Sequence, residues 1–187
     1  MYKGFPMQRA VWPTVLALLS VGCPSAKTAP KEPTAVACQP SKPLVAITAS
    51  DRVNSSAAGQ GRPVQVRIYQ LKSDARLSTA KFEDIWQNDA AVLEKDLVKV
   101  DEYTVYPGQS KTVNVERNAE AHTLAAVALF REPQVKGWFL TYELEPPRKQ
   151  PPCAPPESRI SIWVDRMQIE DGQGRAEVPA ASGSKGN

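Results

Sequence analysis

The chain has 187 residues, of which 42% are hydrophobic and 23% are charged, a composition that excludes a mostly disordered polymer. Its net charge is only +3, and Lys3 and Arg9 account for two of these charges. Because the remainder is nearly neutral, electrostatics give no support for nucleic-acid binding. The length favours one domain with a hydrophobic core.

The first residues have the layout of a secretory signal peptide. A short basic segment, residues 1–9, precedes an apolar run over residues 10–22, which is the order of regions in such signals. The apolar run has about 13 residues, fewer than the roughly 20 that span a bilayer. We therefore predict that residues 1–22 are a signal peptide and not part of the fold.

The end of this segment, Leu19-Ser-Val-Gly-Cys23, resembles the lipobox of bacterial lipoproteins. In that family the cysteine thiol is joined to diacylglycerol and the signal is cut before it, so Cys23 is the predicted lipid attachment site. Each buried CH₂ stabilises membrane attachment by about 0.8 kcal/mol, and two or three acyl chains hold firmly. Ser20 stands where the family usually has Leu, and an ordinary signal peptide is the alternative. Pro24, instead of Asp, implies the outer membrane under the family's sorting rule.

Proline content divides the rest of the chain. Residues 23–42 are rich in Pro, Ser, Lys and Ala without apolar periodicity, which is typical of a tether. A second proline cluster, residues 145–157, excludes a central strand or a helix and predicts a loop. We expect the domain to span residues 43–170 and residues 171–187 to be a disordered tail.

Apolar residues with a period of two predict a series of short strands. The segment 123–130 is apolar on both faces, which is typical of a central strand. A slip in the pattern between Val100 and Tyr103 indicates a bulge or bend. Seven or eight such strands predict a mostly β fold, a two-sheet β-sandwich. The predicted strands cover residues 44–49, 64–69, 98–105, 113–115, 123–130, 138–144 and 160–164.

One segment, about residues 77–97, breaks this pattern. Its apolar residues recur at helical spacing, and polar residues able to cap a helix precede each group. We predict two short helices packed over one edge of the sandwich, inserted after the second strand. The apolar residues are Phe82, Ile85, Trp86, Leu93 and Leu97, and the caps are Ser78 or Thr79 and Asn88 or Asp89.

Residues that could carry catalysis are few. His122 is the only histidine, and nothing at short spacing supplies the oriented nucleophile and third group that a catalytic histidine needs. One histidine and scattered cysteines do not form a metal-ligand pattern. No glycine-rich phosphate loop precedes a helix. We therefore predict a non-enzymatic protein without a metal or cofactor.

Two cysteines remain once Cys23 carries lipid. Cys38 lies just before the first strand, and Cys153 lies in the loop just before the last. Export exposes both to an oxidising compartment, so we predict a disulfide between them. Closing a loop of this length would stabilise the fold by about 4 to 5 kcal/mol. Two independent thiols are the alternative.

The second strand carries a more specific resemblance. Asn54, followed by Gly61-Arg-Pro-Val-Gln-Val-Arg-Ile-Tyr-Gln-Leu71, is similar to the signature of the TssJ (VasD/SciN) lipoproteins of type VI secretion systems. The similarity covers about residues 43–145, whereas the proline-rich segment with Cys153 departs from it. Further matching residues follow in the family's order: Phe82, Trp86, 93–97, Asp101, Glu102, Pro107, Gly108, 125–131 and Trp138.

The resemblance implies a transthyretin-like sandwich, anchored by lipid in the outer membrane and facing the periplasm. It also implies binding to the periplasmic C-terminal domain of TssM, an inner-membrane protein, with TssL reached indirectly through the membrane complex. In the family the loop between the first two strands is the contact element.

In this chain the corresponding loop is polar and rich in small residues, and Val53 is its only large apolar residue. We expect Val53 to be an apolar anchor, with Arg52 and Arg62 as polar contacts. From the residues alone, a mobile connection between sheets is the favoured interpretation, and the binding role comes from the resemblance. The predicted partner-binding loop is Asp51, Arg52, Val53, Asn54, Ser55, Ser56, Ala57, Ala58, Gly59, Gln60, Gly61 and Arg62.

Two other classes of function stand beside this assembly role. A small-ligand or glycan-binding module would use exposed aromatic side chains, for which Tyr69 and Trp163 are the candidates on predicted outward-facing positions. A hydrolase or hydrolase inhibitor is the other class, and the single histidine argues against it.

Overall fold

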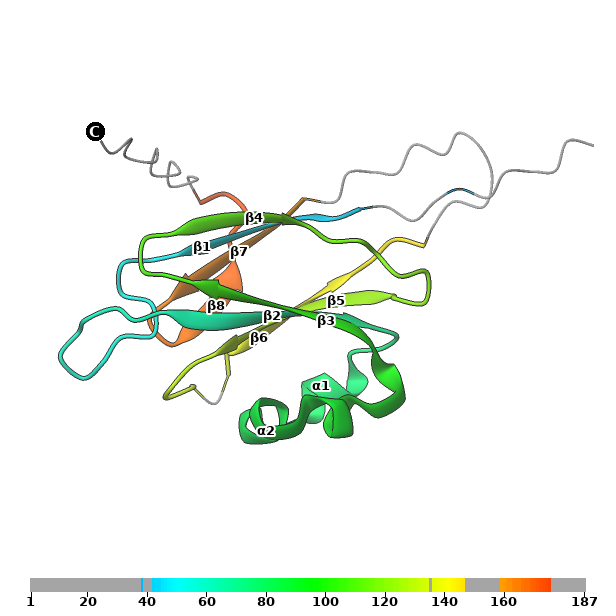
Figure 1. Cartoon of the computed structure of the whole chain (residues 1–187), viewed down its shortest axis with the longest axis horizontal. Coiled ribbons are helices and arrows are strands. Elements are labelled where there is room, and N and C mark those ends of the chain that lie inside the picture. Colours follow the sequence, from blue (N-terminus) through cyan, green and yellow to red (C-terminus); the bar gives the residue numbers. More distant parts are fainter. Residues whose placement is uncertain (1–37, 39–41, 135, 147–158, 176–187) are drawn as a thin grey trace, which may run out of the picture. The chain divides into compact units, whose positions relative to one another are not determined.

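The structure, a computed structural model, describes residues 38, 42–134, 136–146 and 159–175. Two four-stranded sheets pack as a β-sandwich, and a helical segment covers the outer face of one sheet (Figure 1). This confirms the predicted mostly β sandwich with its helical insertion. Within these residues, no helix has the length and apolar character needed to cross a bilayer. The predicted signal peptide, tether and most of the 145–157 loop lie outside the described residues.

The first sheet has the order β4-β1-β7-β8. β1 and β7 pair in parallel, and the other pairs are antiparallel. Along β7, Ile160, Ile162 and Val164 point into the core as predicted. The bounds are β1 Leu44–Ala49, β4 Ser110–Asn114, β7 Arg159–Asp165 and β8 Gln168–Asp171.

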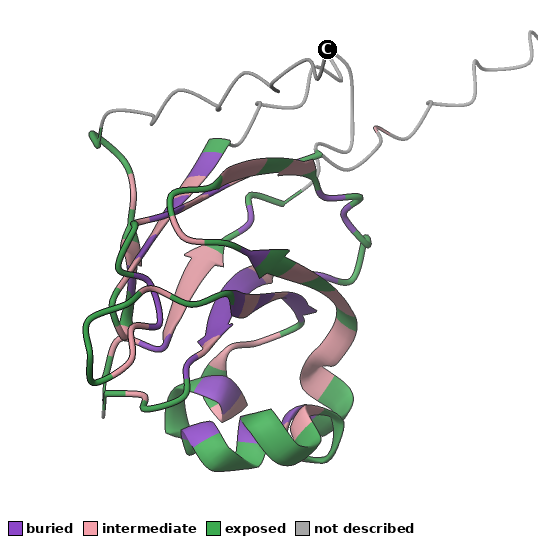
Figure 2. Cartoon of the chain, turned by 60° about the vertical axis from the view of Figure 1, so that its left-hand side comes forward, coloured by how far each residue is buried: buried purple, intermediate pink, exposed green. Residues whose placement is uncertain are grey.

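The second sheet has the order β3-β2-β5-β6, with antiparallel pairing throughout. β5 is a central strand, as predicted, and its residues 124–128 are all buried. They are apolar on both faces because the first sheet covers one face and the helices cover the other (Figure 2). The bounds are β2 Val64–Leu71, β3 Leu97–Val105, β5 Thr123–Leu129 and β6 Phe139–Glu143.

Two details of the strand prediction are wrong. The pairing of β3 with β2 shifts between Leu97 and Lys99, whereas the register is continuous from Val100 through Tyr103. The apolar pattern changes there because Val100 shares the face of Tyr69 under the helices, while Tyr103 shares the face of Val66 toward the other sheet. β8 was not predicted, and it extends the folded part to Arg175, beyond the predicted boundary at residue 170.

The helical segment consists of α1 (Ala75–Thr79), α2 (Phe82–Leu93) and the single 3-10 turn η1 (Glu94–Asp96). Asn88 breaks α2 with φ −155°, and its Oδ1 accepts a hydrogen bond from the Ala91 N–H at 3.2 Å. Asn88 therefore caps the second part of α2, as predicted. Ser78 and Thr79 do not cap a helix start, because both lie at the end of α1.

Trp86 does not share the buried face of α2 that its spacing from Phe82 indicated. Phe82 and Ile85 are buried against the sheet, but the Trp86 side chain is 57% exposed. Phe82 instead packs edge-on against Trp138 of the β5–β6 connection, with ring centroids 5.7 Å apart.

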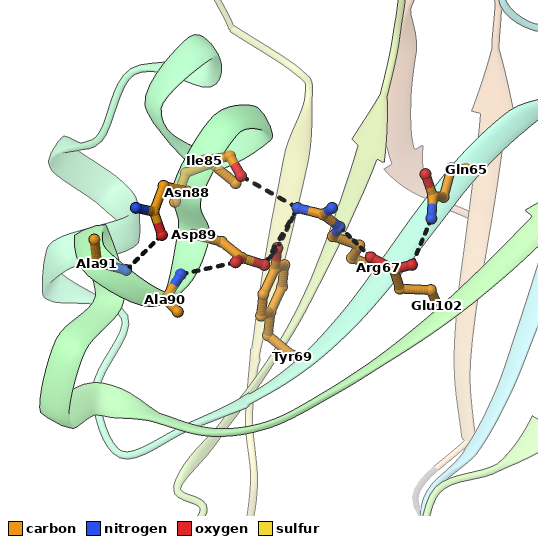
Figure 3. A network of polar contacts seen from close by, with 9 residues as sticks. All are labelled: Gln65, Arg67, Tyr69, Ile85, Asn88, Asp89, Ala90, Ala91 and Glu102. Carbon is orange, nitrogen blue, oxygen red and sulfur yellow. Dashed lines mark hydrogen bonds and ion pairs between the residues drawn. The ribbon is translucent and has the colours of Figure 1, made fainter.

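A polar network fixes α2 to the outer face of β2 (Figure 3). The Tyr69 hydroxyl donates to Asp89 Oδ2 at 2.7 Å, and the Arg67 guanidinium donates to the same atom and to the Ile85 carbonyl, each at 3.2 Å. Arg67 also donates to Glu102 Oε1 at 2.6 Å. Burial and the bond to Asp89 raise the pKa of Tyr69, so the hydroxyl stays protonated and remains a donor.

The position of Tyr69 in this network contradicts its predicted role as an exposed aromatic for glycan binding. Its side chain is fully buried beneath α2. Sequence alternation placed Tyr69 on the outer face of β2, which is correct, but the helices convert that part of the outer face into core.

Replacing Tyr69 with Phe removes one donor to Asp89 and should lower the free energy of unfolding by about 1 to 2 kcal/mol. Urea denaturation of both proteins measures this difference. Glu102→Gln is the matched control, because Glu102 is half-exposed and its replacement should cost less than about 0.5 kcal/mol. Equal losses in the two variants would contradict a stabilising role for the Tyr69–Asp89 bond.

Candidate partner-binding end

Four connections between strands meet at one end of the sandwich, and we call this region the loop end (Figure 1). Hydrogen bonds and close backbone contacts, described below, join them. The chain enters the domain at Leu44, the opposite end of β1 from this region. The loop end comprises residues 50–63, 106–109, 130–138 except 135, and 166–167.

Asn54 is the centre of the loop end. Its backbone N–H donates to the Arg166 carbonyl at 2.5 Å, and its side-chain Nδ2 donates to the Pro63 carbonyl at 2.9 Å. Its Oδ1 accepts a hydrogen bond from the Arg131 N–H at 3.0 Å. Asn54 adopts φ 49°, a left-handed conformation that asparagine tolerates better than most residues. Since it is only 4% exposed, this one residue joins its own loop to two other connections from inside: its side chain bonds to Arg131, and its backbone bonds to Arg166.

The β3–β4 turn packs against the same loop. The Gly108 N–H donates to the Ser50 carbonyl at 3.2 Å. A Cβ on Gly61 would lie 2.1 Å from the Asp51 carbonyl oxygen, so only glycine fits there. Gly108 has φ 71°, which also favours glycine. The glycines of the family signature and of the Pro107-Gly108 turn therefore allow the two loops to touch.

Val53 lies in the core instead of on the surface of the loop. Its side chain has no exposed area, and its carbonyl accepts a hydrogen bond from the Arg62 N–H at 2.8 Å. The prediction of Val53 as an exposed apolar anchor is therefore wrong. Its apolar character reflects packing beneath the loop, which a single sequence cannot distinguish from an interface contact.

The exposed part of the loop is a small turn. The Gly59 N–H donates to the Ser56 carbonyl at 2.8 Å, and the Ser56 N–H donates to the Gln60 carbonyl at 3.0 Å. Residues 57–60 are exposed between these bonds, and Gly59 adopts φ 79°. We call residues 56–60 the tip; its backbone is held by these bonds and by the Asn54 contacts at its base.

Sequence reasoning missed two parts of this end. The β5–β6 connection and the β7–β8 turn lie beside the loop, where Ser55, Lys136 and Arg166 line a shallow hollow. Asn54 was the signal that could have identified them, because a buried asparagine needs partners for its amide. Which residues of these two connections are those partners, however, cannot be read from the sequence, because they lie more than seventy residues from Asn54 along the chain.

The remaining predicted residues lie elsewhere. His122 is an exposed residue at the start of β5, as expected for a strand-entry histidine. Trp163 is half-buried, and the Arg175 guanidinium lies 5.2 Å from its ring centre, so its ring is not an open platform. Cys38 is disulfide-bonded. Cys23 and Cys153 lie outside the described residues, and the Cys38–Cys153 pairing stays a prediction. The described residues hold no group of ligands suited to a metal.

Comparison with solved structures identifies similar folds. The T6SS lipoprotein TssJ1 from Pseudomonas aeruginosa is 25% identical, with a TM-score of 0.62, over 70% of this chain and 94% of that chain. A chain from a structure described as "Type VI membrane complex" is 26% identical, with a TM-score of 0.61, over 71% and 98%. A chain from a structure of the T6SS protein TssM C-terminal domain from EAEC is 24% identical, with a TM-score of 0.57, over 70% and 96%. No curated protein matches the chain.

A family model assigns most of the domain. The T6SS-SciN model, described as "Type VI secretion lipoprotein, VasD, EvfM, TssJ, VC_A0113", matches residues 41–167. This match covers more than half of the chain and includes the whole loop end. It agrees with the expectation of a structural, non-enzymatic protein. The sandwich and this match together establish that the chain belongs to the TssJ/SciN family of type VI secretion lipoproteins.

Proposed function

We propose that this protein is an outer-membrane lipoprotein that anchors the type VI secretion membrane complex by binding the periplasmic C-terminal domain of TssM through its loop end. Two comparisons support this proposal: one similar chain comes from a structure of the TssM C-terminal domain, and another from a type VI membrane complex. The observation that carries it is the exposed tip held on a buried Asn54.

The course of the chain suits an anchor. Cys23 and the proline-rich segment precede Leu44, where β1 begins, and the loop end follows Ala49, where β1 ends. Six residues of β1 separate these two points by about 20 Å. The chain that follows Cys23 therefore enters β1 at the end opposite the loop end, and a pulling force between them would act along β1.

The hydrogen bonds of the tip favour binding in a second way. A loop that must become ordered on binding loses conformational entropy, which weakens the affinity. Here the Ser56–Gln60 turn and the Asn54 contacts order the backbone before the partner arrives. Side chains at the tip are small, so a partner can approach the backbone closely.

The glycan-binding alternative has no comparable support. Tyr69 is buried and Arg175 lies over Trp163, so neither predicted aromatic offers an open stacking face. We therefore retain one proposed function.

Blocking the tip should weaken binding without unfolding the protein. Ala58→Trp places a bulky side chain on an exposed position and should lower the affinity for the TssM C-terminal domain at least about tenfold, because close-packed interfaces require shape complementarity. Ala91→Trp, on an exposed position of α2, is the matched control. Calorimetry with residues 24–187 measures both. Unchanged affinity in Ala58→Trp would move the interface away from the tip.

Asn54→Ala should affect both stability and binding. Two side-chain hydrogen bonds of about 1 kcal/mol each are lost, and alanine in a left-handed conformation costs about 1 kcal/mol more, so unfolding should become easier by about 2 to 3 kcal/mol. Asn54→Gly loses the same bonds without the conformational strain and should lose less. Guanidinium denaturation measures the free energy of unfolding of both variants. A stable Asn54→Ala variant would show that these bonds do not hold the loop end.

Lipid attachment predicts a change of location. Cys23→Ser should move the protein from the membrane pellet to the soluble periplasmic fraction, because no acyl chain remains to hold it. Thr28→Ala is the control, since it changes a residue near Cys23 in the sequence but keeps the lipidated cysteine. Fractionation of cells expressing each variant, with separation of inner and outer membranes, measures this. Persistence of Cys23→Ser in washed membranes would refute the anchor.

A further inference from the structure

Arginine side chains without an ion-pair partner gather at the loop end. Among the described arginines, Arg67, Arg76 and Arg175 form ion pairs. Arg117 is buried and donates to backbone carbonyls. Five exposed arginines remain with no side-chain partner. Four of them, Arg52, Arg62, Arg131 and Arg166, belong to the loop end, and Arg159 alone lies elsewhere.

The Asn54 contacts bring these arginines together from three connections. Arg131 and Arg166 bond to Asn54 through their backbone, and Arg62 bonds to the neighbouring Val53. Lys136 adds a fifth exposed cation, beside Arg166 in the shallow hollow.

The carboxylates of this end do not neutralise it. Asp51 and Glu132 belong to it and Asp165 ends β7 beside Arg166, and among the described residues none of the three forms an ion pair with these cations. Asp165 instead accepts a hydrogen bond from the Ser50 hydroxyl.

Tyr106 adds an apolar contact at the same end. It is 56% exposed, although large aromatic side chains on soluble proteins are usually well buried. Gln109 holds the backbone of Tyr106 in place with two hydrogen bonds. The Gln109 side chain accepts one from the Tyr106 N–H at 3.0 Å, and the Gln109 N–H donates the other to the Tyr106 carbonyl at 3.0 Å. The following Pro107-Gly108 turn touches Asp51 and Gly61. Tyr106 therefore projects next to the loop from a fixed backbone.

This combination is typical of a protein interface. Tyrosine and arginine are the residue types that most often carry binding energy at interfaces. An unpaired guanidinium presents a planar set of donors that matches a carboxylate. Tyr106 beside exposed arginines favours a protein partner over a charged membrane surface, which arginines alone would also attract.

We infer that the loop end recognises an acidic protein surface, with Tyr106 as the apolar anchor and the arginines of three connections pairing with partner carboxylates. The inference rests on the proposed function: the acidic surface belongs to the TssM C-terminal domain. It extends the contact from residues 51–62 to the β3–β4 turn and the β5–β6 and β7–β8 connections.

Matched substitutions test the two parts of the inference. Tyr106→Ala should weaken binding of residues 24–187 to the TssM domain at least about tenfold. Trp86→Ala removes an equally exposed aromatic on α2 and should leave the affinity unchanged. Arg62→Glu combined with Arg131→Glu should weaken binding at least about tenfold and flatten its dependence on salt between roughly 50 and 300 mM. Arg159→Glu is the control for charge reversal. Thermal unfolding checks that each variant is folded.

The outcomes separate this inference from the proposed function. If the unaltered chain does not bind the TssM domain, both fail. If it binds and Ala58→Trp blocks binding, but the Tyr106 and arginine variants bind like the unaltered chain, only the inference fails. Binding of the unaltered domain to vesicles of anionic phospholipid, lost in the arginine variant whose TssM affinity is intact, would overturn the inference in favour of a lipid surface.

Discussion

The loop end depends on the three hydrogen bonds of Asn54. One buried residue in a left-handed conformation reaches the start of β2, the end of β5 and the β7–β8 turn. These elements belong to different sheets, so the same bonds that order the exposed tip also join the two layers at this end. An apolar residue at this position would remove the hydrogen bonds to the Arg131 N–H and the Pro63 carbonyl, each worth about 1 kcal/mol. The binding surface and the stability of the sandwich are therefore coupled.

The two faces of the second sheet explain how the helical insertion serves the fold. Its inner face packs on the first sheet, while the outer face of β2 carries Arg67 and Tyr69 to meet Asp89 of α2. This network lies on the side of the sandwich, away from the tip. Its polar groups are paired within the domain, whereas the arginines of the loop end are not. The charged groups under α2 are thus paired within the domain, whereas the arginines of the loop end remain available to a partner.

Sequence periodicity was sufficient to predict most strands, because in a half-buried strand apolar and polar residues alternate between the buried and the exposed face. It also identified the Asn88 cap, since capping is a local interaction. It failed where burial depends on tertiary packing: Val53 belongs to the hydrophobic core, and Tyr69 is buried beneath α2. β8 is too short to show a period, and pairing with β7 defines it. The resemblance predicts residues 51–62 as the contact loop, which stays a prediction, and the connections beside this loop could be found only from the folded chain.

The distribution of charged residues on the domain, and not the net charge, indicates which kind of partner it binds. A nearly neutral domain has no long-range field to attract nucleic acid, and this holds for the folded protein as for the composition. At short range, however, the fold brings Arg52, Arg62, Arg131 and Arg166 to one end through contacts that no local pattern encodes. Ion pairs formed there contribute more to orientation and partner choice than to affinity. A lipoprotein confined to the same compartment as its partner needs little long-range attraction, because confinement already raises the local concentration. It needs a surface that accepts one orientation, which is the role we propose for Tyr106 and the arginines of the loop end.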